Sequence, residues 1–219
     1  MNGIEKLICG WHLTEDDFME ILSEKDNPQT AVFLAKKAVQ ARKTFYGTKV
    51  FIRGLIEFTN YCKNNCYYCG IRCGNKNAVR YRLTKEEILS CCQEGYRLGF
   101  RTFVLQGGED PFYTDERMED IIRGIKAKYP DCALTLSLGE RSYESYRLFR
   151  QAGADRYLLR HETADDGHYR QLHPENMSLG RRKQCLYDLK ELGYQVGAGM
   201  MVGSPGQTKK TLAQDLAFL

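Results

Sequence analysis

Apolar residues recur along this chain with two different spacings, and the spacing changes near residue 50. Before that point the apolar positions follow a helical period. Thr14 can cap a helix over 15–23, and Asn27 with Pro28 can open a second helix that continues toward residue 45. Residues 1–49 therefore predict a helical N-terminal segment.

From residue 50 onward, short runs rich in β-branched and aromatic residues alternate with longer amphipathic stretches. The short runs predict strands, and the longer stretches predict helices that begin at capping residues such as Thr84. The predicted strands span 51–58, 102–106, 133–138, 156–160 and 195–201, and the predicted helices span 84–98, 115–129, 142–151, 178–192 and a last stretch from residue 208.

Regular alternation of strands and helices is typical of parallel strands joined by crossover helices. Residues 50–219 hold about five such units, so the fold class we predict is α/β, a TIM-type (βα) barrel. A complete eight-unit barrel needs about 250 residues. Here the repeat begins only near residue 50, and the last helix carries no stop signal before Leu219. We therefore expect a barrel that is incomplete at the C-terminus.

Composition and charge restrict the class of protein. The 219 residues are 42% apolar, enough for a folded core, and 32 basic against 28 acidic residues leave a net charge of +4. The chain has no basic stripe interleaved with aromatic residues, so the sequence does not suggest a nucleic-acid partner. No apolar run reaches the roughly 18 residues that cross a bilayer, and residues 1–10 lack the pattern of a signal peptide. We expect a cytoplasmic protein without membrane or nucleic-acid partners.

Nine cysteines in a chain without an export signal favour metal binding over disulfides, because the cytosol keeps thiols reduced. Three of them, Cys62, Cys66 and Cys69, follow the first predicted strand in a C-x3-C-x2-C pattern. Three thiolates on one short loop can each bind one iron of a [4Fe–4S] cluster and leave the fourth iron open for a ligand from outside the protein. An open iron indicates chemistry rather than structure.

Cys73 leaves two other kinds of site open. A structural zinc ion needs four ligands, and a cluster that only transfers electrons also uses four cysteines. Cys73 could supply the fourth thiolate in either case. The cysteines at positions 91, 92, 132 and 185 lie on predicted helices or at the start of a strand, and we expect them to be buried structural residues.

The cysteine pattern, with Tyr68 just before the third cysteine, resembles the signature of the radical S-adenosylmethionine (SAM) superfamily. Gly107, Gly108 and Glu109 follow the second predicted strand and resemble the superfamily's G-G-E motif. The resemblance implies two cofactors, a [4Fe–4S] cluster and SAM, whose methionyl amine and carboxylate occupy the open iron. It also implies that Tyr68 lies beside the adenine of SAM. The G-G-E motif would meet the methionyl ammonium, a task that suits glycine because the backbone must approach closely.

Four further sequence segments indicate a particular family within this superfamily. Residues 104–111, 135–140, 157–163 and 201–208 resemble the HydE family of [FeFe]-hydrogenase maturases, in the branch that also holds biotin synthase and methylornithine synthase. The resemblance implies reductive cleavage of SAM to methionine and a 5′-deoxyadenosyl radical. The implied small-molecule substrate is a sulfur-bearing, iron-linked precursor of the hydrogenase H-cluster. The implied partners are an external electron donor, such as reduced ferredoxin or flavodoxin, and other hydrogenase maturation proteins.

The same resemblance assigns further contacts to SAM and substrate. Glu162 lies at the end of the fourth predicted strand and resembles the family's SAM-binding glutamate, and Arg160 can share its face of the strand as a second anion contact. Arg181 and Arg182 lie in the first turn of a predicted helix, where a cation costs up to about 1 kcal/mol and a bound carboxylate would reverse that cost. Ser137 matches a substrate-contacting position. No catalytic residue is assigned beyond the cluster site.

A biotin synthase-like or methylornithine synthase-like enzyme is the alternative within this branch. Biotin synthase carries a second cluster whose cysteines lie at several strand ends inside the barrel. The corresponding ends here carry Gln106, Ser137, Arg160 and Met200, and none offers a thiolate. The sequence therefore favours the maturase family over biotin synthase.

Overall fold

The computed structural model describes residues 2–219, which form two compact units. The helical unit comprises residues 2–51, 163–168 and 200–219, and the sheet unit comprises residues 52–162 and 169–199. In the part of the chain that is described, no helix is long and apolar enough to cross a membrane.

Short polar caps start the helices of the helical unit. Asn2, Thr14 and Asn27 accept hydrogen bonds from first-turn amides, which satisfies donors that have no partner inside a helix. The second and last helices pack against each other. The helices of this unit are α1 (Gly3–Ile8), α2 (Glu15–Ser23), α3 (Pro28–Tyr46) and α9 (Lys209–Phe218).

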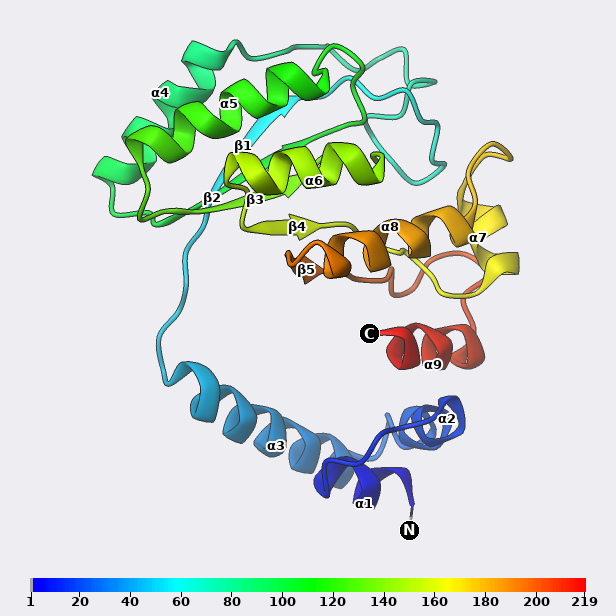
Figure 1. Cartoon of the computed structure of the whole chain (residues 1–219). Helices are drawn as coiled ribbons and strands as arrows, with labels where there is room; N and C mark the ends of the chain where they lie inside the picture. The colour runs from blue at the N-terminus through cyan, green and yellow to red at the C-terminus, as the bar shows by residue number, and fades with distance from the viewer. Residues whose placement is uncertain (1) are drawn as a thin grey trace. The chain divides into compact units, whose positions relative to one another are not determined.

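Parallel strands form the sheet unit, and they follow one another in the sheet in the order of the chain (Figure 1). Each strand is hydrogen-bonded to the next, as in the wall of a barrel built from successive βα units. The strands are β1 (Gly54–Thr59), β2 (Thr102–Gly107), β3 (Ala133–Ser137), β4 (Arg156–Leu158) and β5 (Gln195–Gly197). The connecting helices are α4 (Lys85–Arg97), α5 (Asp115–Lys128), α6 (Tyr143–Ala152) and α8 (Leu179–Glu191), and a short α7 (Asp166–Leu172) precedes α8.

The two faces of the sheet carry different side chains, because successive residues of a strand point to opposite faces. Helices α4, α5 and α6 cover one face (Figure 1). On that face, apolar side chains such as Leu105 and Leu136 are fully buried. On the other face the strand register puts Glu57 opposite Gln106, and Gln106 opposite Ser137. These three residues, here called the inner row, lie near the carboxyl ends of their strands, where a barrel presents functional groups.

Three local features differ from the sequence expectations. β4 and β5 end at residues 158 and 197 rather than 160 and 201, because the chain leaves the sheet in turns, one of which gives Glu162 a φ of 67°. Helix α7 was not predicted from the sequence. Cys91 is exposed although we expected it to be buried, whereas Cys92 is buried. Neighbours on a helix differ by about 100° in direction, so only one of the two can face the core.

Candidate functional site

The segment between β1 and α4, residues 60–83, is here called the cysteine loop. Its two ends are held together at the base, where Thr59 forms an antiparallel bridge with Arg82. The Arg82 guanidinium also makes a two-point ion pair with the buried carboxylate of Asp110, at 2.7 and 2.9 Å. Thr59 Oγ1 donates to the same carboxylate at 2.8 Å. Side chains of this chain therefore close the loop.

A second arginine holds the interior of the cysteine loop. Arg80 donates hydrogen bonds to the backbone carbonyls of Asn60, Ile71, Arg72 and Asn75. These carbonyls lie on both sides of the three predicted ligand cysteines along the chain. The planar guanidinium, with several donors in a fixed geometry, thus ties the two arms of the loop to each other.

The three predicted ligand cysteines are half-buried on this loop. Burial raises the pKa of the Cys62 thiol, and it raises that of Cys66 to about 11. Without a metal both sulfurs are therefore thiols, and an iron that binds them must displace their protons. Three half-buried thiols on one loop form a donor set that fits a [4Fe–4S] cluster with one open iron.

Cys73 is exposed, and its backbone amide donates to the carbonyl of Asn64 at 2.9 Å. Within residues 2–219, no three His, Cys, Asp or Glu side chains are grouped closely enough to hold a single metal ion. Sulfurs about 2.3 Å from one zinc ion must crowd together, whereas sulfurs on separate irons stand farther apart. A zinc site formed with Cys73 would need four such closely grouped ligands.

The glycines after β2 permit a close approach to the cysteine loop. A Cβ on Gly108 would lie 2.2 Å from the carbonyl oxygen of Tyr61 and 2.6 Å from Cβ of Cys62, and a Cβ on Gly107 would lie 2.7 Å from Cγ2 of Thr59. Neither position has room for a side chain. The G-G-E segment thus packs directly on the backbone that presents the first cysteine.

Glu109 links the cysteine loop to the loop after β3. Its buried carboxylate forms an ion pair with Lys63 at 3.2 Å and accepts a hydrogen bond from the amide of Glu140 at 2.9 Å. Its carbonyl accepts a hydrogen bond from the amide of Lys63. Gly139, with a φ of 71°, leaves room for the carboxylate, because a Cβ there would lie 2.3 Å from the glutamate side chain.

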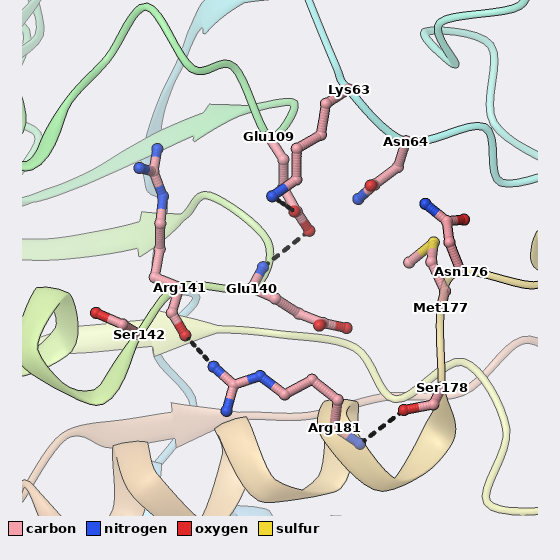
Figure 2. A pocket seen from close by; sticks show the side chains of 10 residues that line it. All are labelled: Lys63, Asn64, Glu109, Glu140, Arg141, Ser142, Asn176, Met177, Ser178 and Arg181. Atoms are coloured by element: carbon pink, nitrogen blue, oxygen red, sulfur yellow. Dashed lines mark hydrogen bonds and ion pairs between the residues drawn. The ribbon is translucent and has the colours of Figure 1, made fainter.

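A polar cavity of about 460 Å³ opens beside these groups (Figure 2). Its walls come from the cysteine loop, the G-G-E segment, the loop after β3 and the start of α8. The lining residues are Lys63, Asn64, Glu109, Glu140, Arg141, Ser142, Asn176, Met177, Ser178 and Arg181. Opposite charges face each other across the cavity, as a zwitterionic amino-acid group would require.

The two predicted arginines of α8 differ in their surroundings. Arg181 lines the cavity with a half-exposed guanidinium, which donates to the carbonyl of Arg141 at 2.5 Å. Arg182 is buried, donates from Nε to Glu140 at 2.6 Å, and donates from Nη1 to the carbonyl of Arg160 at 2.7 Å. Arg181 can therefore meet a ligand anion, whereas Arg182 connects the loops after β3 and β4.

Glu162 combines three features that are uncommon together. It is 6% exposed, its φ of 67° lies in the left-handed region, and its Oε2 has no hydrogen-bond partner among the described residues. Its other oxygen lies 3.8 Å from Nε of Arg160. Burial raises the pKa of the carboxyl. Backbone strain and an unpartnered buried oxygen in one residue indicate a binding position.

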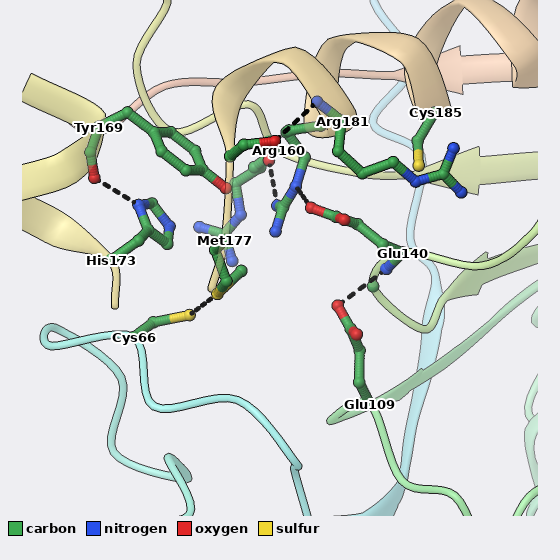
Figure 3. A network of polar contacts seen from close by, with 12 residues as sticks. Cys66, Glu109, Glu140, Arg160, Tyr169, His173, Met177, Arg181 and Cys185 are labelled. Atoms are coloured by element: carbon green, nitrogen blue, oxygen red, sulfur yellow. Dashed lines mark hydrogen bonds and ion pairs between the residues drawn. The ribbon is translucent and has the colours of Figure 1, made fainter. Parts of the chain in front are cut away.

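Three residues at the site, His173, Tyr169 and Met177, were not predicted from the sequence. The hydroxyl of Tyr68 lies 3.0 Å from Nε2 of His173, whose ring stacks on Tyr169 at 3.8 Å between centroids. Met177 places its sulfur 3.7 Å from the sulfur of Cys66 (Figure 3). The contacts of Tyr68 with His173 and of Cys66 with Met177 join residues 105 and 111 positions apart, so no local pattern could have predicted them.

Ser137 lies in the inner row rather than in the lining of the polar cavity. In this row, Gln106 donates to Glu57 at 3.4 Å. The role of Ser137 as a substrate contact stays a prediction. The ligand roles of the three cysteines and the SAM contacts named above also stay predictions.

These features define a class of protein. The sequence pattern of the Radical SAM superfamily matches residues 56–219, and the chain belongs to this superfamily. Members of the superfamily use a [4Fe–4S] cluster and SAM. The predictions of the family, of an α/β barrel fold and of these two cofactors are confirmed.

Individual relatives refine the position within the superfamily. The chain is 50% identical over 186 residues to the [FeFe] hydrogenase maturase subunit HydE of Thermotoga maritima, which covers 85% of this chain and 53% of that protein. It is 30% identical over 212 residues to 3-methylornithine synthase of Methanosarcina acetivorans, 95% and 59% of the two chains. The crystal structure of methylornithine synthase (PylB) superposes with a TM-score of 0.86 at 30% identity, over 97% of this chain and 62% of that one. The chain thus spans little more than half the length of these curated relatives.

Proposed function

We propose that this chain is part of a radical SAM enzyme of [FeFe]-hydrogenase maturation, which cleaves SAM reductively to methionine and a 5′-deoxyadenosyl radical at a [4Fe–4S] cluster. The observation that carries the proposal is the meeting of four elements at one polar cavity beside the three-cysteine loop. The 50% identity to HydE supports the place in hydrogenase maturation.

The walls of the cavity match the charged groups of SAM. Arg181 suits the carboxylate, since the cation and the N-terminus of α8 both favour an anion. Glu109 suits the methionyl ammonium, because its carboxylate is buried and faces the cavity. Outside the lining of this cavity, Glu162 offers an unpartnered oxygen to a hydroxyl of SAM, and Tyr68 offers its ring to the adenine. Cys62, Cys66 and Cys69 would hold the cluster.

Once bound, the cluster supplies the electron that cleaves SAM. The residues of this chain provide orientation. Lys63 and the amide of Glu140 hold Glu109 in one orientation, and Arg182 keeps the loop after β3 against the end of β4. Fixed polar groups of this kind position the bond to be broken without reorganising during the reaction.

We assign the substrate to the barrel side of the sheet. Ser137 and its neighbours in the inner row are polar and lie at the carboxyl ends of the strands, where barrel enzymes bind their substrates. A small sulfur-bearing, iron-linked molecule is the substrate class that we infer from the similarity to HydE. Reduced ferredoxin or flavodoxin as electron donor, other maturation proteins as partners and a cytoplasmic location complete the proposal.

Anaerobic reconstitution tests the proposal. We expect the chain to take up iron and sulfide as a [4Fe–4S] cluster, and we expect SAM to change the electron paramagnetic resonance (EPR) spectrum of the reduced cluster, because SAM binds the open iron directly. A reduced cluster whose EPR spectrum does not change when SAM is added would contradict the enzyme class.

A methylornithine synthase-like function is the second candidate, favoured by the superposition on that enzyme. Product analysis separates the two candidates. Formation of 5′-deoxyadenosine with a sulfur-bearing iron complex, and no formation of 3-methylornithine, supports the maturase function. The reverse result supports the second candidate.

A further inference from the structure

The hydroxyl of Tyr68 is held by a residue that the proposed SAM contacts do not include. Its oxygen lies 3.0 Å from Nε2 of His173. The other ring nitrogen, Nδ1, lies 2.9 Å from the carbonyl oxygen of Tyr169, on which the His173 ring also stacks. His173 is 1% exposed and Tyr169 is fully buried. The imidazole is thus fixed in position and in plane (Figure 3).

The direction of these two hydrogen bonds follows from the partners. A carbonyl oxygen can only accept, so Nδ1 of His173 carries the proton and donates to Tyr169. Burial lowers the pKa of His173 to about 4, so the ring is neutral near pH 7 and its Nε2 can only accept. A tyrosine hydroxyl carries its proton near neutral pH and lies within hydrogen-bond distance of this nitrogen. Tyr68 donates and His173 accepts.

A phenol has one proton to donate, and a second acceptor competes for it. The carboxylate of Glu162 is that second acceptor, because the nearby Tyr68 hydroxyl is one of the groups that lower the pKa of Glu162 against the larger effect of burial. Because His173 takes the proton, Oε2 of Glu162 stays without a hydrogen-bond partner among the described residues although it is buried. An unpartnered buried carboxylate oxygen is costly, and a ligand donor would remove that cost.

We propose that His173 is a positioning residue for SAM binding: it accepts the proton of the Tyr68 hydroxyl, which fixes the Tyr68 ring and reserves the free oxygen of Glu162 for a hydroxyl of SAM. The inference rests on the proposed function. His173 acts through Tyr68 and Glu162 and touches neither SAM nor the cluster.

A double-mutant cycle tests this coupling. SAM affinity is measured by EPR titration of the anaerobically reconstituted chain for wild type, Tyr68→Phe, His173→Ala and the double variant. Each single variant loses the same hydrogen bond, so each should bind SAM about three- to tenfold more weakly, and the double variant should lose no more than either alone. His173→Gln, whose amide oxygen can accept the tyrosine proton, should restore most of the affinity. Iron and sulfide content should stay at the wild-type level.

His168 gives a matched control, because it is a buried histidine of α7 and His173, also buried, directly follows the same helix. Its ring nitrogens contact Thr163, Ser204 and the carbonyl of Pro205 within the helical unit. His168→Gln should leave SAM affinity unchanged even where it lowers the melting temperature.

Three outcomes would overturn the inference. One is wild-type affinity in a cluster-loaded His173→Ala protein, and another is a double variant whose loss is the product of the two single losses. The third is wild-type affinity in Tyr68→Phe, which keeps the ring and so decides the matter even where His173→Ala does not fold. A wild-type chain whose cluster ignores SAM would instead show that the proposed function itself is wrong.

Discussion

The ion pair at the base of the cysteine loop allows a quantitative prediction. Asp110 is 1% exposed and accepts hydrogen bonds from two nitrogens of Arg82, from Oγ1 of Thr59 and from the amide of Phe112 at 3.0 Å. Asp110→Asn removes the charge and leaves Arg82 without its counter-ion. Breaking a buried pair from one side costs about 3–5 kcal/mol. The Arg82 side chain is 34% exposed, and water recovers part of that cost, so we expect about 2–3 kcal/mol.

For a chain of this size each kcal/mol lowers the melting temperature by about 2–4 °C, so Asp110→Asn should melt about 4–12 °C below wild type. Thermal unfolding followed by circular dichroism measures the shift. Glu119→Gln is the control, because its partner Arg123 is exposed and ion pairs between positions i and i+4 of one helix contribute at most about 0.5 kcal/mol. A shift for Asp110→Asn as small as that of the control would refute the reasoning.

The same carboxylate predicts a pH dependence. Burial alone raises the pKa of Asp110, but the hydrogen bonds from Arg82, Thr59 and the amide of Phe112 hold the pKa below its usual value of 3.8. Because the pKa is lower in the folded than in the unfolded state, the stabilisation is complete above about pH 4 and is lost as the pH falls through the folded value. The difference in stability between wild type and Asp110→Asn should therefore be constant near neutral pH and shrink in acid.

Three further predictions concern the ligands. Arg181→Ala should weaken SAM binding by about ten- to a hundredfold, because one charge-assisted hydrogen bond contributes about 1.5–3 kcal/mol, and unchanged affinity in a SAM titration would shift the assignment to another cation. Glu162→Gln should reduce 5′-deoxyadenosine formation while iron content stays intact, and a wild-type rate would make Glu162 a purely structural residue. Cys73→Ser should keep a full cluster that responds to SAM, whereas Ser at any of the three predicted ligands should lose most of the iron. Loss of the cluster in Cys73→Ser would indicate four-cysteine ligation.

Much of the fold follows from local sequence patterns. The first three strands fall within three residues of their predicted bounds, because buried β-rich runs end at turns that are visible in the sequence. Helix starts such as Thr84 were predictable because the capping box is a local motif, and the structure shows both of its hydrogen bonds. Only the tertiary structure shows where β4 and β5 stop, since the chain turns out of the sheet after each of them, toward Glu162 in the case of β4.

The candidate site was predictable where it depends on motifs and not where it depends on contacts. The three cysteines and the two glycines stand at fixed spacings. His173 could not be predicted in this way, because its proposed role depends on a hydrogen bond to a residue 105 positions away. The two α8 arginines are neighbours with the same charge, and only packing distinguishes the exposed Arg181 from the buried Arg182.

The closure of the cysteine loop by Arg80 and Arg82 affects the order in which this protein folds and binds its metal. In a zinc finger, metal binding and folding are one event, because nothing else holds the ligands together. Here hydrogen bonds and an ion pair of the polypeptide already draw the loop shut. The closed loop therefore does not depend on iron in the way that a zinc finger depends on zinc, and folding can precede metal loading.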